Sequence, residues 1–194
     1  MQLRLELTSE SSQQWLDTVM TDFPSFLQDH ADCERKASAM AMSFVAKYPD
    51  RIEMIPELIE TGLEELEHFQ QVYQLMEKRG IQLAKEMKQD QYVKQLIDLC
   101  KSDPINRFLD RLLIASIVEC RGAERFRMVY EAQQDTELKE FYRVLWASEA
   151  KHGDSFVKLA LLYFEEKKVF SRLHELNEAE GKLIHTLPFK AALH

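Results

Sequence analysis

The chain has 194 residues, 45% hydrophobic and 30% charged, with a formal net charge of −8. This composition excludes general disorder, and the acidic balance disfavours a protein that simply coats nucleic acid or a membrane surface. Five glycines and five prolines are too few for a sandwich, barrel or doubly wound sheet, so we expect an all-α fold with long helices.

The first residues contain no apolar run typical of a secretory signal, and no stretch approaches the roughly 20 apolar residues of a membrane span. The three cysteines, Cys33, Cys100 and Cys120, are odd in number and form no CxxC pair. Free thiols in a reducing compartment fit this pattern better than disulfides or a zinc ribbon. We therefore expect a cytoplasmic protein without a membrane segment.

Apolar spacing and helix breakers predict a series of helices. In chain order they run from 9 to 23, 24 to 48, 52–56 to 79, 92 to 100, 104 to 132, 135 to 164 and 171 to 185. Thr8 or Ser9 is the expected cap of the first helix. Pro49-Asp50 and Gln133-Gln134-Asp135 are the expected turns between the longer ones.

The four longest helices pair as two hairpins with short turns, joined by one long connection over residues 81–104. Short turns produce antiparallel neighbours, and a single long crossover is typical of ferritin-like four-helix bundles. We expect one such domain over residues 1–194, with its core at about 24–165 and flanking helices at both ends.

Two Glu-x-x-His motifs occur, Glu65 with His68 and Glu149 with His152. Residues three apart share a helix face, so each motif can present a carboxylate and an imidazole to one metal ion. Either motif alone is a weak signal, because a helical glutamate or histidine is more often a surface or ordinary core residue.

The spacing to two further glutamates carries more information. Glu34 lies 31 residues before Glu65, Glu119 lies 30 before Glu149, and the midpoint of each pair falls on a predicted turn. A rise of about 14 residues, roughly 21 Å, followed by an equal descent returns the chain to the same height. Each hairpin therefore brings a lone glutamate level with a Glu-x-x-His motif.

Four glutamates and two histidines at one level are typical of a carboxylate-bridged dimetal site in a ferritin-like bundle. The surroundings favour this hypothesis over a solvated face. Glu119 follows the apolar run Leu112–Val118, where a buried carboxylate would be costly without a metal or a partner. The predicted metal ligands are Glu34, Glu65, His68, Glu119, Glu149 and His152.

Several neighbouring residues have two interpretations. His30 is a polar residue near the bundle end or a group that supports Glu34. Glu64 and Glu67 compete with Glu65, which alone lies three residues before His68. Trp146 packs in the core or lines the pocket.

Four segments carry a resemblance to a known family. They are residues 29–37 (DHADCERKA), 64–69 (EELEHF), 119–126 (ECRGAERF) and 148–152 (SEAKH). Together they resemble the tRNA hydroxylases that act on 2-methylthio-isopentenyladenosine. The similarity covers most of the chain, from the first helix to residue 185, with no departure at the six predicted ligand positions.

This resemblance implies a non-haem di-iron monooxygenase in which the six residues hold two iron ions. Such enzymes hydroxylate the isopentenyl group of the modified adenosine beside the tRNA anticodon, with dioxygen as co-substrate. No flavin or iron–sulfur motif is present, so a separate reductase is the expected electron donor. No catalytic residue is assigned beyond the metal ligands, and the oligomeric state stays open.

The alternatives are a ferritin-like iron oxidase or storage protein, another di-iron oxidase, and a metal-free helical binding module. The residues that contact RNA are also open. One candidate set is the arginine cluster Arg121, Arg125 and Arg127, and the other is the lysines of the connection, Lys85, Lys88, Lys94 and Lys101. For any single residue of either set, solvated surface is the more common role.

Overall fold

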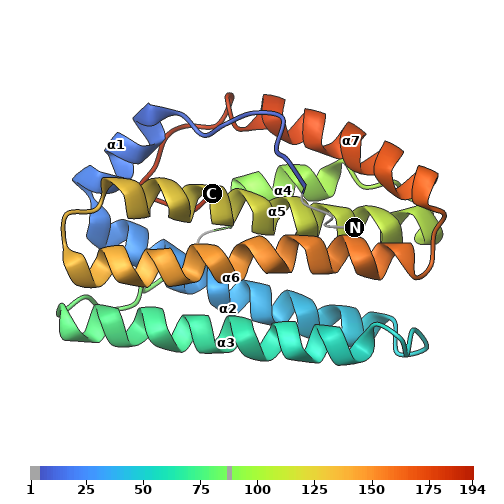
Figure 1. The fold of residues 1–194 in the computed structure, drawn as a ribbon, viewed down its shortest axis with the longest axis horizontal. Coiled ribbons are helices and arrows are strands. Elements are labelled where there is room, and N and C mark those ends of the chain that lie inside the picture. The colour runs from blue at the N-terminus through green and yellow to red at the C-terminus, as the bar shows by residue number, and fades with distance from the viewer. Residues whose placement is uncertain (1–4, 87–88) are drawn as a thin grey trace. The chain divides into compact units, whose positions relative to one another are not determined.

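A computed structural model describes residues 5–86 and 89–194, and within these residues the chain is helical with no strand (Figure 1). The helices are α1 Gln13–Thr21, α2 Phe23–Lys47, α3 Ile55–Lys78, α4 Gln91–Asp98, α5 Pro104–Ala132, α6 Thr136–Leu161 and α7 Glu166–Leu183. Among the described residues, none of these helices is both long and apolar enough to cross a membrane.

The described chain divides into two compact units. One contains residues 17–86 and 190–193, and the other contains residues 5–16, 89–189 and 194. Each unit is built around one predicted hairpin, and the connection between the two hairpins carries the short predicted helix, α4. The single domain over residues 1–194 stays a prediction.

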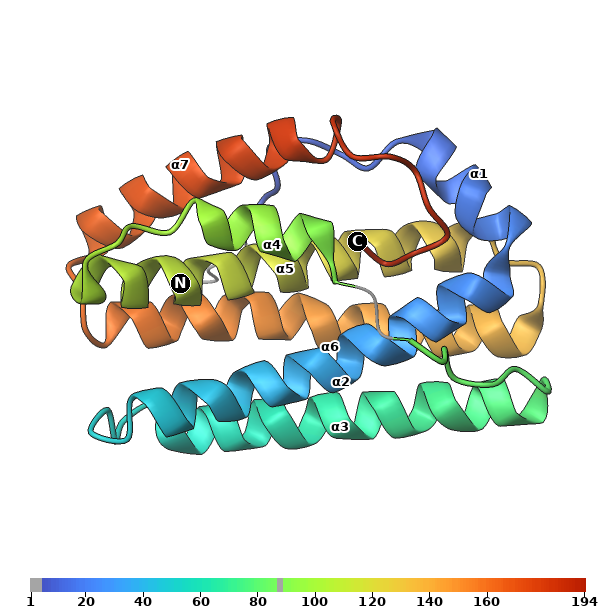
Figure 2. The ribbon, with the colours of Figure 1, turned by 180° about the vertical axis from the view of Figure 1, so that it is seen from behind.

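The first unit is the antiparallel hairpin of α2 and α3, which lie side by side in both views (Figures 1 and 2). Asp22 caps α2 by accepting the backbone N–H of Ser25 at 3.3 Å, which satisfies one of the free donors at a helix start. The Ser38 hydroxyl donates to the Gly62 carbonyl at 2.7 Å. This bond ties the two helices together near the predicted ligands.

The second unit is the hairpin of α5 and α6, with α4 and α7 packed on it. The turn is closed by Asp135, which accepts the backbone N–H groups of Glu137 and Leu138. Between the helices, the Ser116 hydroxyl donates to the Gly153 carbonyl at 2.7 Å. Gly153 permits this approach, because a Cβ at that position would collide with the sulfur of Cys120.

Two predicted helix starts are wrong, and the helix predicted to end at 164, α6, ends at Leu161. Helix α1 begins at Gln13, because Ser12, rather than Thr8 or Ser9, accepts the N–H of Trp15 at 3.2 Å. Helix α7 begins at Glu166 rather than Ser171, and its first turn already buries Val169 against the rest of the unit. A local cap at Ser12 sets the start of α1, whereas tertiary packing of Val169 extends the start of α7.

Candidate metal centre

The first hairpin brings together Glu34 of α2 with Glu65 and His68 of α3. All three are buried, with relative exposures of 3%, 1% and 7%. His68 Nδ1 lies 3.8 Å from Glu34 Oε2 and 3.6 Å from Glu65 Oε2. Each residue offers one ligand atom, and these atoms lie within 4.8 Å of one another, a spacing that one metal ion between them could bridge.

The second hairpin repeats this arrangement with Glu119 of α5 and with Glu149 and His152 of α6. Their relative exposures are 6%, 2% and 2%. His152 Nδ1 lies 3.3 Å from Glu149 Oε2, and one ligand atom from each residue lies within 4.8 Å of the others. Each hairpin therefore carries a buried set of two carboxylates and one imidazole.

The competing glutamates on α3 lie elsewhere. Glu67 is exposed and Glu64 is half-buried, whereas Glu65 is almost fully buried. The helical period accounts for the exposure of Glu67, which adjoins His68 in the sequence and so lies on another side of the helix than Glu65 and His68.

His30 is completely buried on α2, one turn before Glu34. Its Nε2 lies 2.6 Å from Glu34 Oε1, a short hydrogen bond between an imidazole and a carboxylate. Such a bond fixes the orientation of a carboxylate that binds a metal and raises the affinity of the site. Of the two interpretations, the geometry supports a group that positions Glu34.

The donor atoms of both sets suit iron. Buried carboxylates are costly unless they are paired, hydrogen-bonded or bound to a metal. Carboxylate oxygens with one imidazole per set are a donor combination typical of iron and manganese sites in ferritin-like proteins. The residues present therefore fit a metal at each hairpin.

The comparisons with known proteins agree with this chemistry. The family described as tRNA-(MS[2]IO[6]A)-hydroxylase (MiaE) matches residues 2–194. The chain belongs to this family. It is 32% identical over 172 residues to the tRNA 2-(methylsulfanyl)-N(6)-isopentenyladenosine(37) hydroxylase of Pseudomonas putida, a match that covers 89% of this chain and 83% of the relative.

Two further similarities support the assignment. The hydroxylase of the same name from Salmonella typhimurium is 24% identical over 210 residues, covering 84% of this chain and 77% of the relative. A solved structure, protein 43 with aldehyde deformylating oxygenase activity from Synechococcus, has a TM-score of 0.91 at 31% identity. It covers 97% of this chain and 94% of that one, and the all-α, ferritin-like fold class is confirmed.

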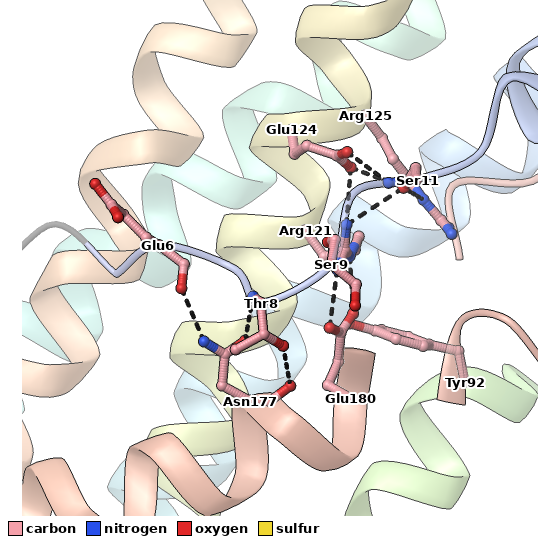
Figure 3. Close-up of polar contacts among 10 residues, drawn as sticks. All are labelled: Glu6, Thr8, Ser9, Ser11, Tyr92, Arg121, Glu124, Arg125, Asn177 and Glu180. Carbon is pink, nitrogen blue, oxygen red and sulfur yellow. Dashed lines mark hydrogen bonds and ion pairs between the residues drawn. The ribbon is translucent and has the colours of Figure 1, made fainter. Parts of the chain in front are cut away.

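The arginines of the family segment ECRGAERF are not free to contact RNA. Arg121 is completely buried and Arg125 is 6% exposed. Arg121 makes a bidentate ion pair with the buried Glu180 of α7, with Nε and one terminal nitrogen each 2.8 Å from a carboxylate oxygen (Figure 3). Two of the three clustered arginines therefore serve the interior of their unit.

The same network fastens the N-terminal segment to its unit (Figure 3). The Ser9 carbonyl accepts a hydrogen bond from Arg121 at 2.8 Å, and the backbone N–H of Ser11 donates to Glu124 at 2.7 Å. Tyr92 donates its hydroxyl to Glu180 at 2.9 Å. Burial raises the pKa of Tyr92 well above its ordinary value, and the Glu180 carboxylate adds to the rise.

The lysines of the connection lie on the surface. Lys85, Lys94 and Lys101 are exposed, and Lys94 pairs with Asp98 at 2.7 Å. Lys88 lies outside the described residues. The exposure of these side chains leaves both interpretations of this set open.

Proposed function

We propose that this protein is a di-iron monooxygenase that hydroxylates the isopentenyl group of 2-methylthio-isopentenyladenosine in tRNA, next to the anticodon. The observation that carries the proposal is the pair of buried sets of two carboxylates and an imidazole, in a chain matched over residues 2–194 by a tRNA hydroxylase family. The proposed substrate implies a cytoplasmic location.

In this proposal, Glu34, Glu65 and His68 are ligands from one hairpin, and Glu119, Glu149 and His152 are ligands from the other. When bound, two iron ions supply the activation of dioxygen. The four carboxylates balance the positive charge of two divalent ions, so burial of the metals leaves little net charge away from water. His30 holds Glu34 in its binding orientation through the bond at 2.6 Å.

The reaction consumes one dioxygen, two electrons and two protons, and it leaves one oxygen atom on the substrate and the other in water. The electrons come, in this proposal, from a separate reductase. The buried ligand sets favour productive oxidation because exclusion of water protects reactive species from side reactions.

The decisive test is oxygen transfer to RNA. The protein is reconstituted with Fe²⁺ without oxygen, reduced, and mixed with dioxygen and an anticodon stem–loop carrying 2-methylthio-isopentenyladenosine. Nucleoside mass spectrometry should show one added oxygen atom, derived from ¹⁸O₂ when that gas is used. Absence of the added oxygen while the iron is reoxidised would refute the assigned substrate.

The ligand roles are tested by iron content with a matched control. His152→Ala should lose most of the iron of its hairpin, because removal of one of three protein ligands weakens a metal site strongly. His174→Ala changes an exposed histidine of α7 and should retain full iron. Equal iron in the two variants would exclude His152 as a ligand.

The structural relative from Synechococcus favours a second candidate, oxidation of an aldehyde. Its name gives an aldehyde deformylating oxygenase activity, and its identity of 31% is close to the 32% of the Pseudomonas putida relative. An aldehyde should therefore be offered to the same reduced protein. Turnover of the aldehyde without turnover of the RNA would favour this candidate.

A further inference from the structure

The outer face of α6 carries a hollow of about 430 Å³ that the proposed metal chemistry does not use. The residues that line it include Arg143, Trp146, Ala150, Lys151, Asp154 and Lys158. Three cations and one carboxylate thus share one side of a helix, in a chain whose net charge is −8. The local charge is opposite in sign to that of the whole protein.

A second hollow, of about 400 Å³, adjoins the first and shares Trp146, Ala150 and Asp154 with it. Its other walls include Arg127 and Glu124 of α5 and the N-terminal segment with Glu6 and Glu10, so this hollow, unlike the first, carries more carboxylates than cations. The Nε of Arg127 is buried and makes no hydrogen bond to any residue of the described chain. Because this atom is closed off from solvent, it offers no accessible donor to a ligand.

Trp146 stands between the two hollows. The small side chain of Ala150, one turn further along α6, leaves open space beside the indole. Tyr130 of α5 stacks on the indole at a centroid distance of 6.2 Å and an interplanar angle of 23°. The indole is therefore partly exposed, packed against Tyr130, and bordered by cations on the side of the first hollow.

The wall formed by the N-terminal segment is fixed as well. Asn177 of α7 bonds to the Glu6 carbonyl at 2.8 Å and accepts the N–H of Thr8 at 3.4 Å (Figure 3). Arg121 holds the Ser9 carbonyl. The second hollow is consequently formed before any ligand binds, which lowers the entropic cost of binding.

We propose that this surface binds single-stranded nucleotides of the anticodon loop, with a base stacked on Trp146 and phosphates at Arg143 and Lys158. The inference rests on the proposed tRNA substrate. Proteins bind single-stranded RNA through aromatic platforms that stack bases and cations that follow the backbone. Arg143 now pairs with Glu140 at 2.6 Å, but both groups are largely exposed, and such a pair exchanges readily for a phosphate.

The position on α6 indicates which nucleotides bind. Trp146 lies one turn before Glu149, yet residues 143, 147, 150 and 154 follow a helix face different from that of Glu149 and His152. The surface therefore fits nucleotides that flank the modified adenosine rather than the modified adenosine itself. Binding there would hold the loop while the isopentenyl group reaches the ligands.

Fluorescence tests the stacking directly. The chain has two tryptophans, and Trp15 is 3% exposed beneath the Arg125 guanidinium. The modified anticodon stem–loop should quench the emission of the wild type and equally that of Trp15→Phe, in which only Trp146 emits. Trp146→Ala should bind this RNA about 5- to 100-fold more weakly, whereas Phe189→Ala, a change of another exposed aromatic, should bind normally.

Charge reversal tests the phosphate contacts. Arg143→Glu with Lys158→Glu should weaken RNA binding and should make the slope of log K against log salt shallower by about 1 to 2. Lys167→Glu with Lys182→Glu makes the same change in net charge at exposed positions of α7 and serves as the control. Equal weakening in both double variants would mean that net charge, not this surface, governs binding.

The outcomes separate this inference from the proposed function. If the wild type oxidises the RNA while Trp146→Ala and the α6 double variant bind it with unchanged affinity, the proposed RNA-binding surface is wrong and the proposed function stands. If the RNA quenches Trp146 but gains no oxygen, the surface stands and the assigned reaction fails. If Trp146→Ala or the α6 double variant loses reductase-dependent turnover but binds the RNA with unchanged affinity, the surface binds a protein partner instead, and the inference is overturned.

Discussion

The buried ion pair between Arg121 and Glu180 yields a sharp prediction about stability. Both side chains have 0% exposure, and the guanidinium makes two hydrogen bonds of 2.8 Å to the carboxylate. Arg121→Met keeps much of the side-chain volume but removes the charge. Glu180 then retains the Tyr92 hydroxyl as a hydrogen-bond donor but loses its opposite charge.

The expected cost follows from the burial of both partners. Removal of one member of a fully buried ion pair costs about 3–5 kcal/mol, because the other charge stays in a poorly solvating interior. For a chain of this length, 1 kcal/mol corresponds to about 2–4 °C in Tm. Arg121→Met should therefore lower Tm by roughly 10 °C, a large part of a total stability of about 5–15 kcal/mol.

The double variant Arg121→Met/Glu180→Gln distinguishes this mechanism from a simple loss of packing. Glutamine keeps an acceptor for Tyr92 and removes the stranded charge, so the double variant should be at least about 1 kcal/mol more stable than Arg121→Met. Unfolding by heat and by urea, followed by circular dichroism, measures both differences. A loss below about 1 kcal/mol for Arg121→Met, or a double variant less stable than that single variant, would refute the argument.

Three further predictions concern single positions. Burial raises the pKa of Tyr92, so the folded state keeps the phenolic proton that the unfolded chain loses near pH 10. Stability should therefore fall as the pH rises above about 10, and Tyr92→Phe should flatten this fall in alkaline melts. Gly153→Ala should destabilise the fold by about 1–3 kcal/mol, because the added methyl group collides with the Cys120 sulfur on α5. Gly122→Ala has open space around the added methyl group, so in parallel melts the stability should stay unchanged or rise by up to about 1 kcal/mol. His30→Gln should weaken iron retention against a chelator by about 10- to 100-fold, and unchanged retention would exclude a positioning role at Glu34.

The helices and the two ligand sets were accessible from the sequence because both depend on local periodicity. A helix advances by a fixed rise per residue, so turns at Pro49-Asp50 and Asp135 were enough to predict which positions return to the same height. The observed grouping of Glu34 with Glu65 and His68 follows this arithmetic. Iron as the metal, and the ligand role of each residue, stay predictions.

The surroundings of Arg121 were not accessible in this way. Its partner Glu180 lies 59 residues away on α7. Nothing in the local pattern of α5 distinguishes Arg121 from the half-buried Arg127. The same limit applies to the start of α1, since Thr8, an expected helix cap, donates its hydroxyl to the Asn177 carbonyl of α7 instead. Local rules fail where a polar side chain finds a distant partner.

These internal ion pairs change how the net charge of −8 bears on RNA binding. Arg121 is committed to Glu180 inside the protein, so it contributes nothing to an external surface. At physiological salt, charges further than about 8 Å from a phosphate are largely screened. Phosphates at Arg143 and at Lys158 therefore respond to the charges beside each cation, Glu140 near Arg143 and Asp154 near Lys158, and not to distant carboxylates. An acidic protein can bind RNA on this basis, provided that the contacts are few and close.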